Sequence, residues 1–78
     1  MPTVLRVEGF NFFFFAADRN EPPHIHVERG DGAAKFWLNP IKIDYSRRFK
    51  KQEIKRATEI IEEHQNFLMD RWNEYFEE

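Results

Sequence analysis

The spacing of apolar residues changes from a two-residue period to a helical period near Ser46. In residues 1–45, apolar side chains alternate with polar ones in short runs separated by Gly, Pro and Asp, which is typical of strands. From residue 50 to residue 76 the apolar positions recur at steps of three, four and seven: Ile54, Ala57, Ile61, Leu68, Trp72 and Tyr75. The pattern therefore predicts one domain, residues 1–78, with a β-sheet half (1–45) and a helical half (46–78).

The strand-like half begins with a predicted hairpin. Residues 4–7 and 10–16 flank Glu8-Gly9, a dipeptide suited to a two-residue turn. The second of these runs is apolar on both faces, which predicts a strand inside the sheet. Residues 41–44 alternate in polarity after Asn39-Pro40 and predict a short edge strand.

A second hairpin follows, and its register can be predicted. With Asp31-Gly32 in the turn, Glu28 lies opposite Lys35 and His26 lies opposite Trp37. One face of this hairpin is then wholly apolar, with Ile25, Val27, Phe36 and Leu38. The other face carries His24, His26, Glu28, Lys35 and Trp37, with Glu28 and Lys35 as an expected cross-strand ion pair.

An unbroken helix over residues 50–76 would be about 40 Å long at 1.5 Å per residue. A domain of this size should be about 30 Å across. Either the helix breaks near His64, or its end overhangs and presents Trp72, Tyr75 and Phe76 to a partner. Alternatively, these aromatic side chains simply cover the sheet. The expected fold class is α+β: a curved antiparallel sheet of four to five strands, followed by one long or two shorter C-terminal helices packed on one face.

Composition narrows the choice of function. The chain has 78 residues and no Cys, so disulfides and thiolate zinc sites are excluded. Its 9 Phe, 2 Trp and 2 Tyr supply the core instead. The net charge of −2 argues against a nucleic-acid coat protein. The sequence shows neither a signal peptide nor a membrane-spanning run, so we expect a cytoplasmic protein.

The segment Pro22-Pro23-His24-Ile25-His26 is the sharpest chemical feature. Positions i and i+2 of a strand share one face, so the two imidazoles would lie about 6.5–7 Å apart along it. Two such histidines can bind zinc or another divalent metal if a third ligand joins them. The candidates for that ligand are Glu28, Glu21, Asp18 and His64. Without such a ligand, no cofactor is expected.

The same pair also suits acid–base cleavage of RNA. One imidazole would accept the 2′-hydroxyl proton and the other would protonate the leaving oxygen, while Lys35 would stabilise the phosphorane. Two other interpretations remain: His24 and His26 pack and hydrogen-bond structurally, or they form a binding surface with Trp37 and Glu28.

Charge is segregated in the helical half. Six basic residues cluster at its start: Arg47, Arg48, Lys50, Lys51, Lys55 and Arg56. Basic residues at the start of a helix are the opposite of what the helix dipole favours. Such a cluster suits the binding of phosphate groups or of an acidic partner. The alternative is a solvated face. The sequence contains no Gly-rich phosphate loop, which argues against nucleotide chemistry.

Several segments together resemble a small prokaryotic family, domain of unknown function 4160. They are the opening Met-Pro-Thr-Val-Leu-Arg, the Phe12–Phe15 run, Asn20-Glu-Pro-Pro-His-Ile-His-Val27, Ala34-Lys-Phe-Trp-Leu38 and Trp72-x-x-Tyr-Phe76. The family motif carries over to His24, His26, Lys35, Trp37 and Trp72. Lys50 replaces the small residue that usually caps the helix. The resemblance implies a small stand-alone protein often encoded beside a domain of unknown function 2442 protein, and computational suggestions make the pair a toxin–antitoxin module.

Three functions follow from these observations. The first is a toxin-like component of a two-gene module that binds a small partner protein, and RNA as well, through the His-x-His face. The second is a non-catalytic adaptor that forms a homodimer through its C-terminal aromatic residues. The third is a metal-dependent hydrolase that uses His24 and His26. If the protein is an enzyme, we expect a ribonuclease-like or metal-dependent activity.

Overall fold

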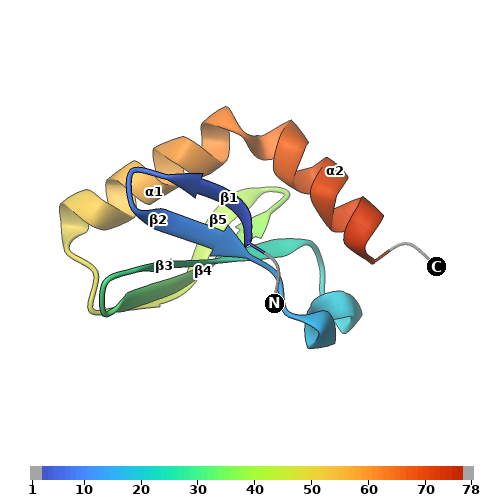
Figure 1. Cartoon of the computed structure of the whole chain (residues 1–78), viewed down its shortest axis with the longest axis horizontal. Coiled ribbons are helices and arrows are strands. Elements are labelled where there is room, and N and C mark those ends of the chain that lie inside the picture. The colour runs from blue at the N-terminus through green and yellow to red at the C-terminus, as the bar shows by residue number, and fades with distance from the viewer. Residues whose placement is uncertain (1–2, 77–78) are drawn as a thin grey trace.

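The computed structural model describes residues 3–76, which form a five-stranded antiparallel sheet and two helices (Figure 1). The elements are β1 (Thr3–Val7), β2 (Phe10–Phe13), the 3-10 helix η1 (Ala16–Asn20), β3 (His24–Arg29), β4 (Gly32–Leu38), β5 (Ile41–Arg47), α1 (Lys51–Glu63) and α2 (Gln65–Tyr75). The spatial order of the strands is their order in the chain. The predicted α+β class is confirmed, with five strands and two helices.

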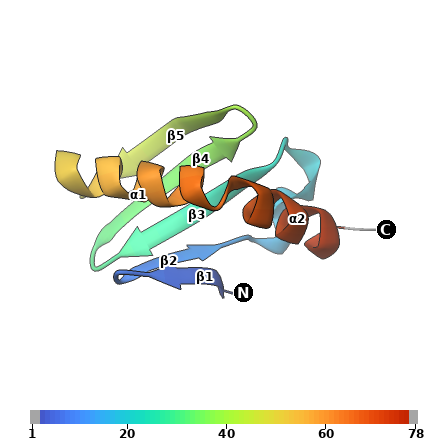
Figure 2. The ribbon, with the colours of Figure 1, turned by 90° about the horizontal axis from the view of Figure 1, so that it is seen from above.

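Both α-helices lie on the same side of the sheet (Figures 1 and 2), whereas η1 lies on the opposite side, beside the start of β3 (Figure 1). Apart from η1, no described element covers that opposite side, which is called the uncovered face below. Apolar side chains of the covered face and of both helices make up the core: Phe10, Phe12, Phe14, Ile25, Val27, Ala34, Phe36, Leu38, Ala57, Ile60, Ile61, Leu68 and Trp72. The alternate positions of the inner strands therefore point to the uncovered face.

The first hairpin is as predicted, but its second strand is shorter. Val7 pairs with Phe10 across Glu8-Gly9, whose φ angles of 53° and 83° belong to a left-handed turn. β2 has strand neighbours on both sides, as expected for an inner strand. It ends at Phe13 rather than at residue 16, because the chain turns into η1 there.

The predicted register of the second hairpin is wrong by two residues. Arg29 pairs with Gly32, so the turn is Gly30-Asp31, and His26 faces Lys35 instead of Trp37. Gly30 supplies the positive φ of the turn, at 58°. Gly32 lies in β4, where a Cβ atom would collide with the ring of Phe49. A shift of two residues keeps every side chain on its predicted face.

β5 lies at the edge of the sheet, as predicted, but it extends from Ile41 to Arg47. Its pairing with β4 is irregular between Lys35 and Phe36, where the partners change from Tyr45 to Ile43 and Asp44 is left unpaired. All but the first residue of this strand is exposed. The sheet thus ends in a long exposed strand.

The helical half breaks at His64, so the alternative of one overhanging helix is wrong. The His64 backbone N–H donates to the carbonyls of Ile60 and Ile61, which ends α1, and its own carbonyl accepts from Leu68 N–H at 2.8 Å, which begins α2. The domain measures 37 × 21 × 20 Å. Within residues 3–76, neither helix has the length and apolar character needed to cross a membrane.

The start of α1 is stabilised by a side chain that the sequence did not identify as a helix cap. The carboxylate of Glu53 accepts a hydrogen bond from the backbone N–H of Lys50 at 2.9 Å, and its other oxygen lies 2.8 Å from Arg29 Nη1. An acidic side chain therefore does stand at the helix N-terminus, where the dipole favours it.

Candidate functional site

A carboxylate lies between the two histidines of the His-x-His segment. Asp18 Oδ1 lies 3.2 Å from His24 Nε2, and Asp18 Oδ2 lies 3.1 Å from His26 Nε2. The histidines belong to β3, whereas Asp18 belongs to η1, between β2 and β3. Of the four predicted third ligands, the structure brings Asp18 into the cluster.

Local backbone structure fixes the position of Asp18. The backbone N–H of Phe15 donates to Asp18 Oδ2 at 2.8 Å, and the Asp18 N–H donates to the Phe15 carbonyl at 3.0 Å. The chain then returns through Pro22-Pro23, and the Pro23 carbonyl accepts from Leu38 N–H at 3.1 Å. This loop folds η1 back over the start of β3, so Asp18 meets both imidazoles.

His24 is fully buried in the structure. Its ring lies between two indoles, with centroids 5.5 Å from Trp37 and 5.0 Å from Trp72. Its Nδ1 lies 2.9 Å from the Pro22 carbonyl oxygen. Although its Nε2 is 3.2 Å from Asp18, that nitrogen makes no hydrogen bond of acceptable geometry within the described part of the chain.

His26 sits at the edge of the cluster and retains 9% exposure. Its ring stacks on Phe13 at 5.7 Å and meets the edge of Phe15 at 4.6 Å. Burial lowers the pKa of His26 below its usual value of 6.5, and the nearby Asp18 carboxylate opposes that shift. The ring is therefore predominantly neutral at pH 7.

Lys35 lies opposite His26 in the sheet but is paired with carboxylates. Its Nζ is 2.7 Å from Glu21 Oε1, 3.6 Å from Asp44 Oδ2 and 4.5 Å from the centre of the Trp37 ring. Desolvation acts to lower the pKa of Lys35, but Glu21 and Asp44 outweigh it and raise the pKa above 10.5. The same hydrogen bond lowers the pKa of Glu21.

The expected ion pair of Glu28 with Lys35 is therefore wrong. Glu28 lies opposite Ala33 and is exposed. This follows from the two-residue error in register, since that error displaced every cross-strand pair along β3 and β4.

This arrangement does not support direct acid–base catalysis by the histidine pair. Such catalysis requires both imidazoles to reach the substrate. His24 offers no exposed surface, and both of its ring nitrogens face protein oxygens. Lys35 already has two carboxylate neighbours. The structure brings His24, His26 and Lys35 together without giving them a common substrate-facing surface.

Five of the six predicted basic residues are exposed and the sixth, Arg56, is half-buried. Arg47 ends β5, Arg48 follows it with φ 58°, and Lys50 and Lys51 begin α1. Arg56, in contrast, binds Glu8 and Glu59. Arg47 is the member of this group that ends a strand of the sheet.

The predicted C-terminal aromatic residues divide into core and surface. Trp72 is 6% exposed, and its ring packs on Phe14 at 5.2 Å and on Phe76 at 4.2 Å. Tyr75 is 41% exposed. Trp72 therefore cannot serve as an exposed docking anchor in this fold.

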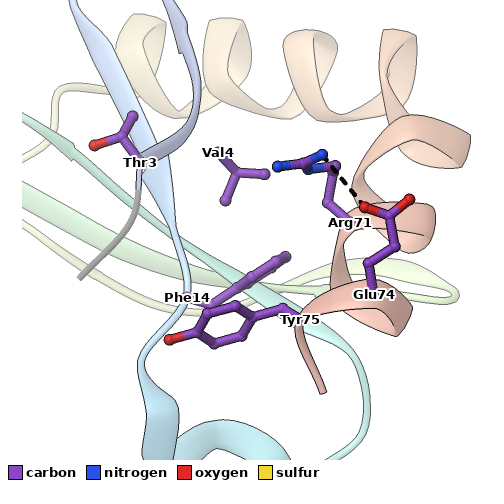
Figure 3. A pocket seen from close by; sticks show the side chains of 6 residues that line it. All are labelled: Thr3, Val4, Phe14, Arg71, Glu74 and Tyr75. Carbon is purple, nitrogen blue, oxygen red and sulfur yellow. Dashed lines mark hydrogen bonds and ion pairs between the residues drawn. The ribbon is translucent and has the colours of Figure 1, made fainter. Parts of the chain in front are cut away.

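A pocket of about 160 Å³ lies between β1 and α2 (Figure 3). It is lined by Thr3, Val4, Phe14, Arg71, Glu74 and Tyr75. Figure 3 shows the Phe14 and Tyr75 rings side by side below the Arg71–Glu74 ion pair, which measures 3.3 Å. The pocket contains no member of the histidine cluster, and its two charged groups neutralise each other.

Sequence reasoning missed two exposed aromatic residues beside His26. Phe15 is 42% exposed and Tyr45 is 49% exposed, and both line a shallow pocket of about 80 Å³ together with His26 and Arg47. Phe15 was assigned to a strand that ends before it. Tyr45 lay beyond the predicted end of the fifth strand, although the alternation Ile43, Tyr45 was a signal that the strand continues.

Comparison with known proteins gives one match. The family model for the domain of unknown function DUF4160 matches residues 9–73, which is 65 of the 78 residues. The matched region contains the whole Asp18–His24–His26 cluster, Lys35, Trp37 and Trp72. No curated protein and no solved structure matches the chain. The chain therefore belongs to the DUF4160 family.

Proposed function

We propose that the protein binds single-stranded RNA on the uncovered face of its sheet, and that it acts in this way as the toxin-like component of a two-gene module. The observation that carries the proposal is the placement of Phe15 and Tyr45, both exposed, around a shallow pocket that Arg47 also lines. The role in a two-gene module rests on the family resemblance.

The register assigns further side chains to this face. Ala34 and Phe36 of β4 are core residues, so Lys35 and Trp37 point the other way. Tyr45 lies opposite Lys35. Basic side chains on this face, or at its margin, supply positive charge: Arg6, Lys42 and Arg47. Lys35 lies on the same face but is paired with Glu21 and Asp44.

Aromatic and basic groups on one open sheet face match the chemistry of single-stranded RNA. Unstacked bases stack on exposed rings such as those of Phe15 and Tyr45, with about 1–3 kcal/mol per base. The guanidinium of Arg47 suits a phosphate oxygen. Duplex RNA offers no exposed base faces, so the face favours single strands.

The proposal is for binding rather than cleavage. The two imidazoles share one carboxylate, and both are buried, that of His24 completely. In this proposal the protein slows growth by withholding the bound transcript from translation.

Edge strand β5 favours a small partner protein as a second ligand. Its exposed edge can accept another strand by main-chain hydrogen bonds, and Ile43 is 37% exposed on it. A partner that adds a strand here would lie beside Tyr45 and compete with RNA. The family resemblance makes a domain of unknown function 2442 protein the candidate partner.

RNA binding is tested by fluorescence anisotropy with a labelled, mixed-sequence single-stranded RNA. Loss of one stacking ring in Tyr45→Ala should weaken binding roughly 5- to 150-fold. Arg47→Gln should weaken binding and reduce its salt dependence. Phe67→Ala is the matched control, because Phe67 is 43% exposed but lies on α2. Equal affinity of Tyr45→Ala and the control would refute RNA binding on this face.

The module role is tested by expression in cells. Wild-type protein should slow growth, and Tyr45→Ala should relieve the effect at equal protein level. Co-expression of the neighbouring partner should also restore growth, and Ile43→Lys should prevent that rescue. If the wild-type protein binds RNA in vitro but does not slow growth, the toxin role is rejected and RNA binding is not.

A further inference from the structure

We propose that Asp18, His24 and His26 form a binding site for a divalent transition-metal ion. Each residue offers one ligand atom, and the three atoms lie within 4.8 Å of one another. The inference rests on the geometry of these three residues and not on RNA binding, although His26 also lines the shallow pocket that Phe15 and Tyr45 share.

The hydrogen bond of His24 fixes which ring nitrogen carries the proton. The Pro22 carbonyl can only accept, so Nδ1 must donate across the 2.9 Å contact. In the neutral ring, Nε2 then presents a lone pair. A backbone carbonyl that holds the far nitrogen of an imidazole is also the usual support of a metal-binding histidine.

The lone pair of His24 faces an acidic oxygen inside the protein. Nε2 lies 3.2 Å from Asp18 Oδ1, its atomic surface is buried, and it has no hydrogen bond within residues 3–76. Two electron-rich groups at this distance repel each other, and buried polar atoms of this kind are rarely left unpaired. A cation bound by both groups turns that repulsion into attraction.

The spacing fits one small cation. Zinc bonds of 2.0–2.1 Å in a tetrahedral site place neighbouring ligand atoms about 3.3–3.4 Å apart. The Asp18 contacts to His24 and His26 measure 3.2 and 3.1 Å. The two contacts use different oxygens of Asp18, and the three ligand atoms lie within 4.8 Å of one another, so binding of one ion requires the side chains to draw closer together.

The ligand set selects the class of metal. Two imidazoles and one carboxylate suit zinc, cobalt, nickel or iron(II), whereas calcium and magnesium prefer oxygen ligands throughout. The Asp18 side chain is 12% exposed and the His26 side chain 11%, so the ion would be reached from their side and not from that of His24.

The other sequence candidates for a third ligand are engaged elsewhere. The His64 Nδ1 donates to the Ile60 carbonyl at 2.7 Å, at the junction of the two helices. Glu21 pairs with Lys35 and lies 3.7 Å from Nδ1 of His24, the nitrogen that is already bonded. Glu28 is exposed near the far end of β3.

The test uses the untagged full chain after treatment with EDTA. Calorimetric titration with Zn²⁺ should give one site per chain, and Co²⁺ should give the visible absorption of a cobalt ion with nitrogen ligands. Asp18→Asn and His26→Gln should each weaken Zn²⁺ binding at least about 10-fold, since even outer-shell losses cost 10- to 100-fold. Zn²⁺ should raise the unfolding temperature of wild type more than that of either variant.

His64→Gln is the matched control, because it removes the remaining histidine outside the cluster. It should bind Zn²⁺ within about twofold of wild type. Asp18→Asn retains an oxygen to accept from Phe15 N–H, and circular dichroism of each variant should match that of the wild type. The proposal is overturned if wild type shows no saturable binding. It is also overturned if both cluster variants bind as wild type does, or if His64→Gln alone loses binding.

Discussion

The guanidinium of Arg56 on α1 binds both carboxylate oxygens of Glu8 in the β1–β2 turn. Nε lies 2.9 Å from Oε1 and Nη2 lies 2.7 Å from Oε2, across 48 positions of sequence. This two-point contact ties the first hairpin to the helical layer. It also occupies one of the six clustered basic residues, so the basic run is less available to an anion than its sequence indicates.

This pair makes stability depend on pH. The Arg56 hydrogen bond lowers the pKa of Glu8 below its usual 4.5. The unfolded chain therefore binds more protons than the folded chain just below pH 4.5. In that range the free energy of unfolding decreases as the pH is lowered. The contribution of Glu8 is complete above about pH 5 and is lost as the pH falls through the lowered pKa.

Urea unfolding of wild type and Glu8→Gln at several pH values measures this effect. Glu8→Gln should lower the midpoint at pH 7, and the two proteins should converge once the pH falls below the lowered pKa of Glu8. Glu74→Gln is the control, because Glu74 makes a single exposed contact with Arg71. A constant difference between wild type and Glu8→Gln over the whole pH range would contradict the assignment.

Gly32→Ala should destabilise the fold. Its Cβ atom would strike the Phe49 ring and lie 2.8 Å from the Arg48 carbonyl oxygen. Overpacking of this kind costs about 1–3 kcal/mol. Gly30→Asn is the comparison, since Asn tolerates a positive φ and no atom lies within 4 Å of the added Cβ. Urea denaturation should show the larger loss for Gly32→Ala; equal losses would mean that Phe49 moves aside at no cost.

Trp72→Ala should cost about 3–5 kcal/mol, because its buried ring contacts Phe14, His24 and Phe76. Tyr75→Ala, at an exposed neighbouring position, should cost far less. Chemical denaturation of both variants, with sedimentation of the folded fractions, separates packing from association. A fully stable Trp72→Ala protein that merely changes its oligomeric state would favour the interface interpretation instead.

Gln65→Ala should loosen the junction of the two helices. The Gln65 side chain donates to the Leu38 carbonyl at 2.7 Å, which links the start of α2 to the end of β4. Loss of such a bond costs about 0.5–1.5 kcal/mol. Hydrogen exchange of the α2 amides should speed up in this variant but not in Gln52→Ala, an exposed position of α1. Unchanged exchange would show that the link is not needed.

Much of the fold follows from local patterns. Alternation predicted the strands, and Glu8-Gly9 predicted the first turn. The helical stripe, set against the size of the domain, left two alternatives, a break near His64 or an overhanging helix, and the structure has the break. These features depend on neighbours within a few positions, so one sequence contains them. The register of the second hairpin did not follow, because Gly32 is needed under Phe49, a residue 17 positions away.

The candidate site divides in the same way. The sequence by itself placed His24 and His26 on one strand face beside Lys35 and Trp37, since the two-residue period of a strand requires it. Only the tertiary structure decided that Asp18 lies between the imidazoles and that Trp72 covers His24. Those contacts depend on the path of the β2–β3 loop and on the direction that α2 takes after the helix break at His64. Both are set by packing of the whole chain, which no local pattern encodes.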